Sequence, residues 1–431
     1  MSRQKLYLQV YEYYKALIEA GDLKEGEKLP SIRRCCQERG VSKTTVEQAY
    51  MCLCDDGYVM SKSQSGYYVL KRPAKEQNTY SAAKSREEKP LIFDFSSTGV
   101  DPESFDINLW RRYMKSALRR NEELLSYGEP QGEYELRAAV ADYIRRRRNC
   151  VCDEGRIVIG AGVQSLLSIL CPMLSGEKTV CFDDLSYFQG TAVFSDFGFK
   201  ISNDREKSRV LYVSPSHFNR WGGTMSAGER FALAEYAVKQ GKQIIEDDYG
   251  SEFRYINRPT PSLQGLDGGR SVVYLGTFSR LLLPTIRISF MILPQSLMPA
   301  YEKRRNLYNQ TVSKSSQIAL CSYIRDGHLD ATIRKSRKLY AQKSRLLTEE
   351  LKKAFGDRVE ILKTDSPLFV RCKIKGVEDS ASLVRSARAE GVGLINAGGE
   401  NGAQIAFSVS PVKSEFFPQA AAKLKSAVEK Q

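Results

Sequence analysis

The sequence of 431 residues predicts an α/β protein in which a small N-terminal domain precedes a much larger one. Three observations predict this organisation. Three helical patterns and a hairpin pattern lie within residues 1–72, which is enough chain for one small domain. A polar stretch bracketed by prolines follows, over residues 73–90. From residue 91 to residue 431, short runs typical of buried strands alternate with helical patterns.

The N-terminal domain begins with three predicted helices. Apolar residues recur at helical spacing over residues 6–20, which indicates the first helix. Ser31 is placed to cap the second helix, and Ser42, after a glycine turn, to cap a third over residues 43–53. Two short helices joined by such a turn form a helix-turn-helix. We expect Tyr50 to pack the third helix rather than to read a base.

A β-hairpin, the wing of a winged helix, is predicted after the third helix, with strands at 57–60 and 67–70. Several motifs of this domain occur in a fixed order: Leu-Pro-Ser-x-Arg at 29–33, Val-Ser-Lys-x-Thr-Val at 41–46, Ala-Tyr at 49–50, Gly-Tyr at 57–58 and Ser-Gly at 65–66. In order and spacing, the segment closely resembles the winged helix of the GntR-type regulators.

This resemblance implies that the partner is double-stranded operator DNA. The start of the third helix would face base edges and phosphates in the major groove, and the wing would approach the minor groove. Arg33, the last residue of the Leu-Pro-Ser-x-Arg motif, would hold a backbone phosphate. The residues implied in DNA contact are Arg33, Ser42, Lys43, Thr44, Thr45, Ser65 and Gly66. A net charge of +14 favours such a polyanionic partner, although charge alone does not identify it.

The larger domain is organised around a polar turn, Gly-Thr-Phe-Ser-Arg at 276–280, between two apolar runs at 271–275 and 288–293. Small hydroxyl residues and two arginines, Arg280 and Arg287, gather on this turn, where ligands of α/β proteins usually bind. Further strands are predicted at 156–159, 179–182, 209–213 and 243–245, followed by a long helical segment over about 298–354 and an α+β tail.

The large domain resembles the aminotransferase-like domain of the MocR/GabR regulators, a fold-type-I pyridoxal-phosphate transferase fold with a mixed, mostly parallel sheet and a smaller α+β subdomain. The likeness rests on segments such as Tyr-Gly-Glu-Pro-Gln-Gly at 127–132, Glu-Asp-Asp-Tyr at 246–249 and the turn at 276–280. It implies a cofactor pocket in which Gly162 and Val163 cradle phosphate, Tyr187 covers the pyridine ring, Asp247 pairs with the ring nitrogen, Tyr249 and Asn219 reach the ring oxygen, and Thr277, Ser279 and Arg287 bind phosphate.

Two departures from the family's pattern concern the residues that define amino-acid chemistry. Arg280 stands where the family has the lysine that forms an imine with pyridoxal phosphate. A guanidinium stays protonated and is a poor nucleophile, so both the covalent anchor and the general base are lost. Gln404 stands where the family usually has an arginine for the substrate carboxylate. Arg280 could pair with Asp247, or act as a second cation beside Arg287, and the sequence leaves both arrangements open.

We therefore expect a cytoplasmic transcriptional regulator of the MocR/GabR type that is not an enzyme and forms a homodimer. Its large domain would sense a phosphorylated or amino-acid-like small molecule, and pyridoxal phosphate would bind only non-covalently or be absent. One alternative is a pyridoxal-phosphate-dependent aminotransferase or lyase with an appended DNA-binding domain. Another is a DNA-binding dimer that needs no ligand. The operator, the effector and the direction of regulation do not follow from the sequence.

Composition adds two expectations. Ten cysteines are dilute in a chain of this length, and Cys-x-Cys pairs with only two histidines do not form a usual zinc pattern. We therefore expect reduced thiols and no metal site. No run of apolar residues is long enough to predict a membrane span.

Overall fold

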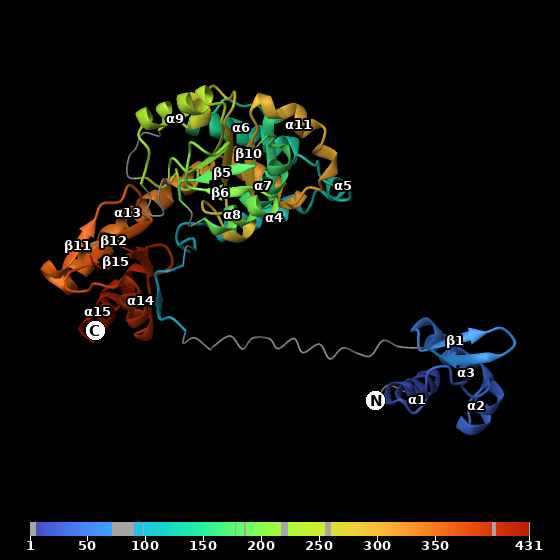
Figure 1. The fold of residues 1–431 in the computed structure, drawn as a ribbon. Coiled ribbons are helices and arrows are strands. Elements are labelled where there is room, and N and C mark those ends of the chain that lie inside the picture. Colours follow the sequence, from blue (N-terminus) through green and yellow to red (C-terminus); the bar gives the residue numbers. More distant parts are fainter. Residues whose placement is uncertain are drawn as a thin grey trace. The chain divides into compact units, whose positions relative to one another are not determined.

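The computed structural model divides into two compact units, Met1–Glu88 and Lys89–Gln431, whose elements are labelled in Figure 1. The structure describes residues 6–70, 90–97, 99–176, 178–184, 187–216, 223–254, 260–398 and 402–430. Of the predicted linker at 73–90, only Pro90 is among them. In the described part of the chain, no helix has the length and apolar character needed to cross a bilayer. All ten cysteines are free thiols.

The N-terminal unit is a winged helix, as the sequence predicts. Its elements are α1 (Leu6–Ala20), α2 (Ile32–Arg39), α3 (Lys43–Asp55), β1 (Val59–Lys62) and β2 (Gly66–Val69), the two strands forming an antiparallel hairpin. Both predicted capping serines are confirmed: Ser31 accepts a hydrogen bond from the backbone of Arg34 at 3.3 Å, and Ser42 from that of Thr45 at 3.2 Å. Tyr50 is fully buried, which confirms its predicted packing role.

The C-terminal unit is built on a seven-stranded sheet of order β4-β10-β9-β8-β7-β5-β6. Its strands are β4 (Ile157–Gly160), β5 (Thr179–Phe182), β6 (Lys200–Ser202), β7 (Val210–Val213), β8 (Gln243–Asp247), β9 (Val273–Thr277) and β10 (Ser289–Ile292). Strand β10 is antiparallel to both of its neighbours, and the other pairs are parallel. Every strand predicted in this region forms, and only β6 was not predicted.

Helices cover both faces of this sheet (Figure 1). Successive residues of one strand enter different cores: Val158 of β4 packs with helices α7 and α8, whereas Ile157 and Ile159 pack with α6 and α12. This alternation follows from the two-residue period of a strand, and burial on both faces explains why the strands are apolar throughout. The covering helices are α6 (Tyr134–Arg148), α7 (Val163–Leu170), α8 (Phe188–Asp196), α9 (Ala227–Lys239) and α12 (Lys314–Arg325), with α4 (Ile107–Ala117), α5 (Asn121–Leu124) and α10 (Leu263–Leu266) beside them.

The prediction of one long helical segment over 298–354 is wrong in its first half. The structure has three helices there: α11 (Met298–Glu302), α12 (Lys314–Arg325) and α13 (His328–Phe355). Ser313 begins α12 by accepting a hydrogen bond from the backbone of Ser316 at 3.3 Å. Gly327 adopts the left-handed conformation, with φ of 77°, and separates α12 from α13.

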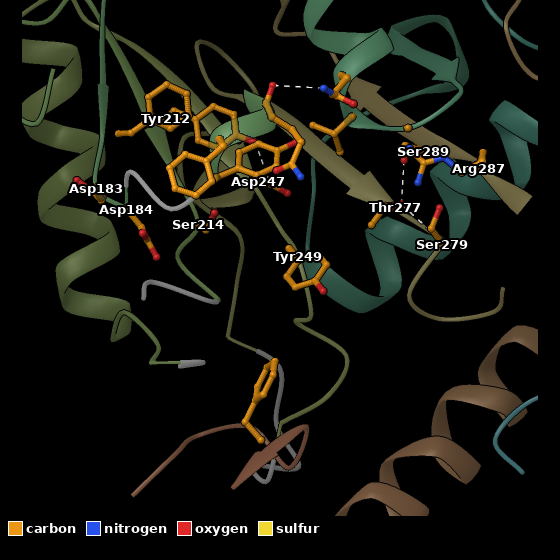
Figure 2. Close-up of a pocket in the computed structure, with 18 of the residues that line it drawn as sticks. Asp183, Asp184, Tyr212, Ser214, Asp247, Tyr249, Thr277, Ser279, Arg287 and Ser289 are labelled. Atoms are coloured by element: carbon orange, nitrogen blue, oxygen red, sulfur yellow. Dashed lines mark hydrogen bonds between the residues drawn. The ribbon is translucent and has the colours of Figure 1, made fainter. Parts of the chain in front are cut away.

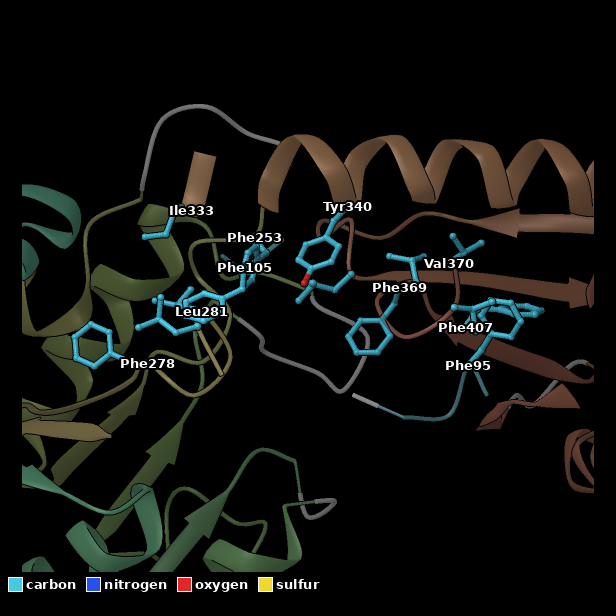
Figure 3. Close-up of a cluster of buried hydrophobic side chains, with 14 of the residues drawn as sticks. Phe95, Phe105, Phe253, Phe278, Leu281, Ile333, Tyr340, Phe369, Val370 and Phe407 are labelled. Carbon is cyan, nitrogen blue, oxygen red and sulfur yellow. The ribbon is translucent and has the colours of Figure 1, made fainter. Parts of the chain in front are cut away.

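The chain ends in a smaller subdomain with an antiparallel sheet of order β11-β12-β15-β14. Its elements are β11 (Val359–Leu362), β12 (Phe369–Ile374), α14 (Ser380–Ala389), β14 (Ile395–Gly398), β15 (Gln404–Ser408) and α15 (Phe417–Glu429). A two-stranded parallel sheet joins β3 (Phe93–Asp94) to β13 (Val392–Gly393). Phe95, Phe407 and Val370 meet in the core of this subdomain (Figure 3).

A buried ion pair ties the end of α6 to the chain just after β8. The Arg148 guanidinium donates to both carboxylate oxygens of Asp248, at 2.6 and 2.8 Å, and the two side chains are almost completely buried. The Tyr274 hydroxyl donates to the same carboxylate at 2.5 Å, and that of Ser216 at 2.7 Å. Burial opposes ionisation of Asp248, but the charge of Arg148 and these hydrogen bonds outweigh it and hold the pKa of the carboxyl below its usual value.

Replacing this arginine tests the stability of the unit. Arg148→Met leaves the Asp248 carboxylate buried without its cation, so we expect the free energy of unfolding to fall by about 3–5 kcal/mol in urea titrations. The matched control is Arg146→Met, because Arg146 is exposed on the same helix and its loss is expected to cost no more than about 0.5 kcal/mol. Equal effects of the two substitutions would contradict this role of Arg148.

Candidate functional site

A cavity of about 780 Å³ opens at the carboxyl ends of β5, β7, β8 and β9, and residues of the smaller subdomain form part of its wall. Figure 2 shows its side chains, with Thr277, Ser279, Arg287 and Ser289 grouped on one side. Its lining includes Ser96, Gly162, Val163, Gln164, Phe182, Asp183, Asp184, Tyr187, Tyr212, Ser214, Asp247, Tyr249, Thr277, Ser279, Arg287, Ser289, Phe369 and Ile395. Most residues implied by the resemblance are therefore brought together here. Asn219 lies outside the described residues.

One end of the cavity is suited to an anion. Helix α7 starts after Gly162, whose φ of 91° favours glycine, and a Cβ atom there would lie only 2.3 Å from the Arg287 guanidinium. The arginine thus rests directly against the start of the helix, where backbone N–H groups and the helix dipole favour negative charge. Among the described residues, the buried Ser279 hydroxyl has no hydrogen-bond partner, and it remains available to a bound group.

The hydroxyl groups at this end are arranged by the strands below them. Ser289 of β10 donates to the hydroxyl oxygen of Thr277 at 2.8 Å, and these two residues pair across the β9–β10 register. The backbone N–H of Ser279 donates to the same oxygen at 3.3 Å. The Thr277 oxygen therefore accepts two bonds and leaves its own proton free to be donated to an anion.

The centre of the cavity combines a buried carboxylate with stacked aromatic rings. The Tyr212 hydroxyl donates to Asp247 at 2.6 Å, and its ring stacks on Phe182 at 4.7 Å and on Tyr187 at 5.8 Å between centroids. Burial raises the pKa of Asp247 to about 6, although the Tyr212 bond opposes the shift and neighbouring Asp248 adds to it. Tyr212 was not predicted as a site residue, because it lies in an apolar strand. A buried tyrosine hydroxyl needs a polar partner, and this need could have indicated its role.

Arg280 lies beside this centre and is not among the residues that line the cavity. Its side chain is buried, and the guanidinium carbon lies 5.8 Å from the ring centroid of Tyr249 and 6.0 Å from that of Phe369. Both distances lie near the outer limit of about 6 Å for cation–π contacts. Arg280 therefore lies close to both Tyr249, which follows β8, and Phe369, which belongs to β12. No lysine is present among the described residues that line the cavity.

The Arg371 guanidinium lies beside Gln404 of β15. The side-chain oxygen of Gln404 accepts a hydrogen bond from Arg371 of the neighbouring strand β12 at 2.7 Å. Arg371 pairs with Ala406, and Ala406 pairs with Ile395, a residue of the cavity wall. Sequence reasoning saw only the absence of an arginine at position 404, because the partner strand could not be identified from spacing.

The predicted DNA-contacting residues of α3 divide into two kinds. The Ser42 hydroxyl caps the helix and lies 2.8 Å from that of Thr45, so both groups already have partners within the protein. Lys43 and Thr44 are exposed at the first turn, and Lys43 makes an exposed ion pair with Glu47, at 3.6 Å. Lys43 and Thr44 are thus the side chains of this turn that are most available to a ligand.

The other residues predicted to contact DNA lie in the wing and on α2. Gly66 begins β2 with φ of 115°, and a Cβ atom there would meet the Lys28 side chain at 2.9 Å. The Ser65 hydroxyl lies 2.6 Å from that of Tyr68, and Arg33 is exposed on α2. The surface of the winged helix therefore carries cations and small polar groups, as a phosphate backbone would require.

Comparisons with known proteins agree with both units. Residues 6–69 match the model of the family described as bacterial regulatory proteins, gntR family. The uncharacterized HTH-type transcriptional regulator YdeL of Bacillus subtilis is 34% identical over 406 residues, which cover 90% of this chain and 88% of YdeL. The probable rhizopine catabolism regulatory protein MocR of Rhizobium meliloti is 28% identical, covering 90% of this chain and 85% of MocR.

Two further comparisons each cover about four fifths of the chain. The pyridoxine biosynthesis regulator PdxR of Corynebacterium glutamicum is 27% identical over 80% of this chain and 78% of its own. The crystal structure of LysN, an α-aminoadipate aminotransferase of Thermus thermophilus, superposes with a TM-score of 0.67 at 22% identity, covering 79% of this chain and 92% of LysN. At that identity the superposition shows a shared fold.

The raised pKa of Asp247 makes stability depend on pH. Because the native state holds this proton more tightly than the unfolded chain does, the stabilisation is complete below about pH 4 and is lost as the pH rises through 6. Asp247→Asn removes the titrating carboxyl, and with it this loss of stability at higher pH. We expect its stability relative to the parent to increase by about 2 kcal/mol between pH 4.5 and 7.5 in urea titrations. Exposed Asp357→Asn is the control, and a parallel pH dependence of all three proteins would contradict the burial argument.

Proposed function

The chain belongs to the MocR-type transcriptional regulators, in which a GntR-family winged helix is fused to an aminotransferase-like domain, and from this premise we propose that the larger unit senses a small anion without catalysing a reaction. One observation carries the proposal: position 280, where the imine lysine is expected, is an arginine, and no lysine lines the described part of the cavity. An amine that can lose its proton is required for covalent attachment of an aldehyde cofactor. A guanidinium does not meet that requirement.

The fit of pyridoxal phosphate to the cavity is partial. Its phosphate suits the anion end at Gly162, Ser279 and Arg287, where a hydroxyl is available and only glycine fits against the arginine. Its ring nitrogen would have to share Asp247 with Tyr212, whose hydroxyl already donates to that carboxylate. When bound, the compound would supply a phosphate and an aromatic ring for non-covalent contacts. These features support a reversible ligand of this type, or another phosphorylated anion.

The winged helix supplies the output of the sensor. Regulators with this domain bind DNA, and we propose that Lys43 and Thr44 reach the major groove. Arg33 would hold the phosphate backbone, and Ser65 and Gly66 would let the wing approach the minor groove. Ser42 and Thr45 then act chiefly by fixing the start of α3. A homodimer would present two such helices to a repeated site, and ligand binding would shift the population between arrangements that fit it well or poorly. Acting on DNA in this way, the protein would work in the cytoplasm.

Restoring an amine at position 280 tests the loss of covalent chemistry. Arg280→Lys is expected to take up pyridoxal phosphate with a visible absorbance change, and borohydride should fix one equivalent at position 280, as read by peptide mass. Arg280→Gln is the control, because it removes the guanidinium without adding an amine. If Arg280→Lys binds no more cofactor than Arg280→Gln, the cavity is not a degenerate cofactor site.

Removing two exposed side chains of α3 tests the DNA interface. We expect Lys43→Ala with Thr44→Ala to weaken binding at least about tenfold to a duplex selected from random sequence by the parent protein, since a good base contact contributes about 1–3 kcal/mol. The slope of log affinity against log salt should fall by about one for the lost cation. Lys24→Ala, an exposed lysine outside α3, is the control. Unchanged anisotropy titrations for the double variant would remove α3 from the interface.

A further inference from the structure

The segment 90–97, which follows the linker, is attached to the smaller subdomain. Strand β3 pairs with β13, the Phe95 N–H donates to the backbone oxygen of Gly393 at 2.9 Å, and the Ser408 N–H donates to that of Phe95 at 2.9 Å. The fully buried Phe95 ring packs against Phe407 at 5.4 Å between centroids (Figure 3). The chain that leads from the winged helix is therefore rooted in this subdomain.

This same segment forms part of the cavity wall through Ser96. The Ser96 hydroxyl donates to Asp94 at 2.5 Å, and the Ser96 N–H donates to the same carboxylate oxygen at 2.9 Å. With its only proton directed at Asp94, the hydroxyl offers lone pairs to the cavity and can accept a hydrogen bond. Asp94 does not itself line the cavity, but its partly exposed carboxylate lies directly behind Ser96, and no ion pair of Asp94 is found over the described ranges.

The anion end of the cavity has the reverse character. There Arg287, the start of α7 and the Thr277 and Ser279 hydroxyls favour an anion. These residues belong to the seven-stranded sheet and its helices, whereas Asp94 and Ser96 are attached to the smaller subdomain. A ligand that bound both groups of residues would carry an anion and a cationic hydrogen-bond donor. It would connect the seven-stranded sheet to the smaller subdomain.

We propose that Asp94 and Ser96 form a subsite for the ammonium group of a ligand whose phosphate is held at Arg287. This inference rests on the proposed anion-sensing function and names the ligand class as amino phosphates. Because the subsite lies in the segment that leads to the linker, occupation of it fixes the root of the linker relative to the seven-stranded sheet. The cavity thereby reports its state to the winged helix, and a phosphate without the amine fills only the anchoring end.

The test uses the full chain and two series of probes, alkyl phosphates and ω-aminoalkyl phosphates of two to six carbons. We expect the amino compound of the best length to bind about tenfold more tightly than its alkyl partner in calorimetric titrations, as a charge-assisted bond predicts. It should also slow hydrogen exchange of the amides in residues 91–97, which the alkyl phosphate should not do. Both effects should disappear in Ser96→Ala and in Asp94→Asn.

Ser97→Ala is the matched control, because its hydroxyl accepts from the Gly99 backbone at 3.4 Å and does not line the cavity. If alkyl phosphates bind but no amino compound gains affinity, the subsite is wrong and the anion sensor stands. A gain that persists in both Ser96→Ala and Asp94→Asn also overturns the subsite. If neither series binds in the titrations, the anion sensor fails together with the subsite.

Discussion

The cavity depends on the burial of three consecutive carboxyl groups, Glu246, Asp247 and Asp248, where β8 ends. Alternation along a strand sends the first and third to one side, where Arg230 lies 3.7 Å from Glu246 and Arg148 binds Asp248. The middle one is sent to the other side, into the cavity. Without the two arginines, this concentration of negative charge could not be buried, and the position of Asp247 would not be defined.

Arg280 changes what this scaffold can do. A buried guanidinium between the rings of Tyr249 and Phe369 holds a permanent charge and contributes packing, while an amine in the same place would exchange protons. The anion end at Arg287 is unaffected by that change, since it is built from the start of α7 and the hydroxyls of β9 and β10. Binding and chemistry are therefore separable in this cavity, as the proposed anion sensor requires.

Local patterns in the sequence predicted the local structure well, and contacts between distant segments less well. The caps at Ser31 and Ser42 follow from one residue and its neighbours, and the buried strands from short apolar runs. The bond from Tyr212 to Asp247 and the place of Ser96 in the wall depend on which strands become neighbours, and spacing along the chain does not reveal this. The break before α12 was missed because a serine cap within a helical pattern competes with continuation of the helix.

The most direct test of a regulator that binds without reacting is made on the unaltered protein. Pyridoxal phosphate is added, borohydride is applied, and the intact mass is measured after dialysis, with a parallel sample dialysed first. The account predicts that the spectral change disappears on dialysis and that no lysine carries a stoichiometric adduct. One equivalent fixed to a single lysine, together with conversion of an amino acid over time, would contradict it.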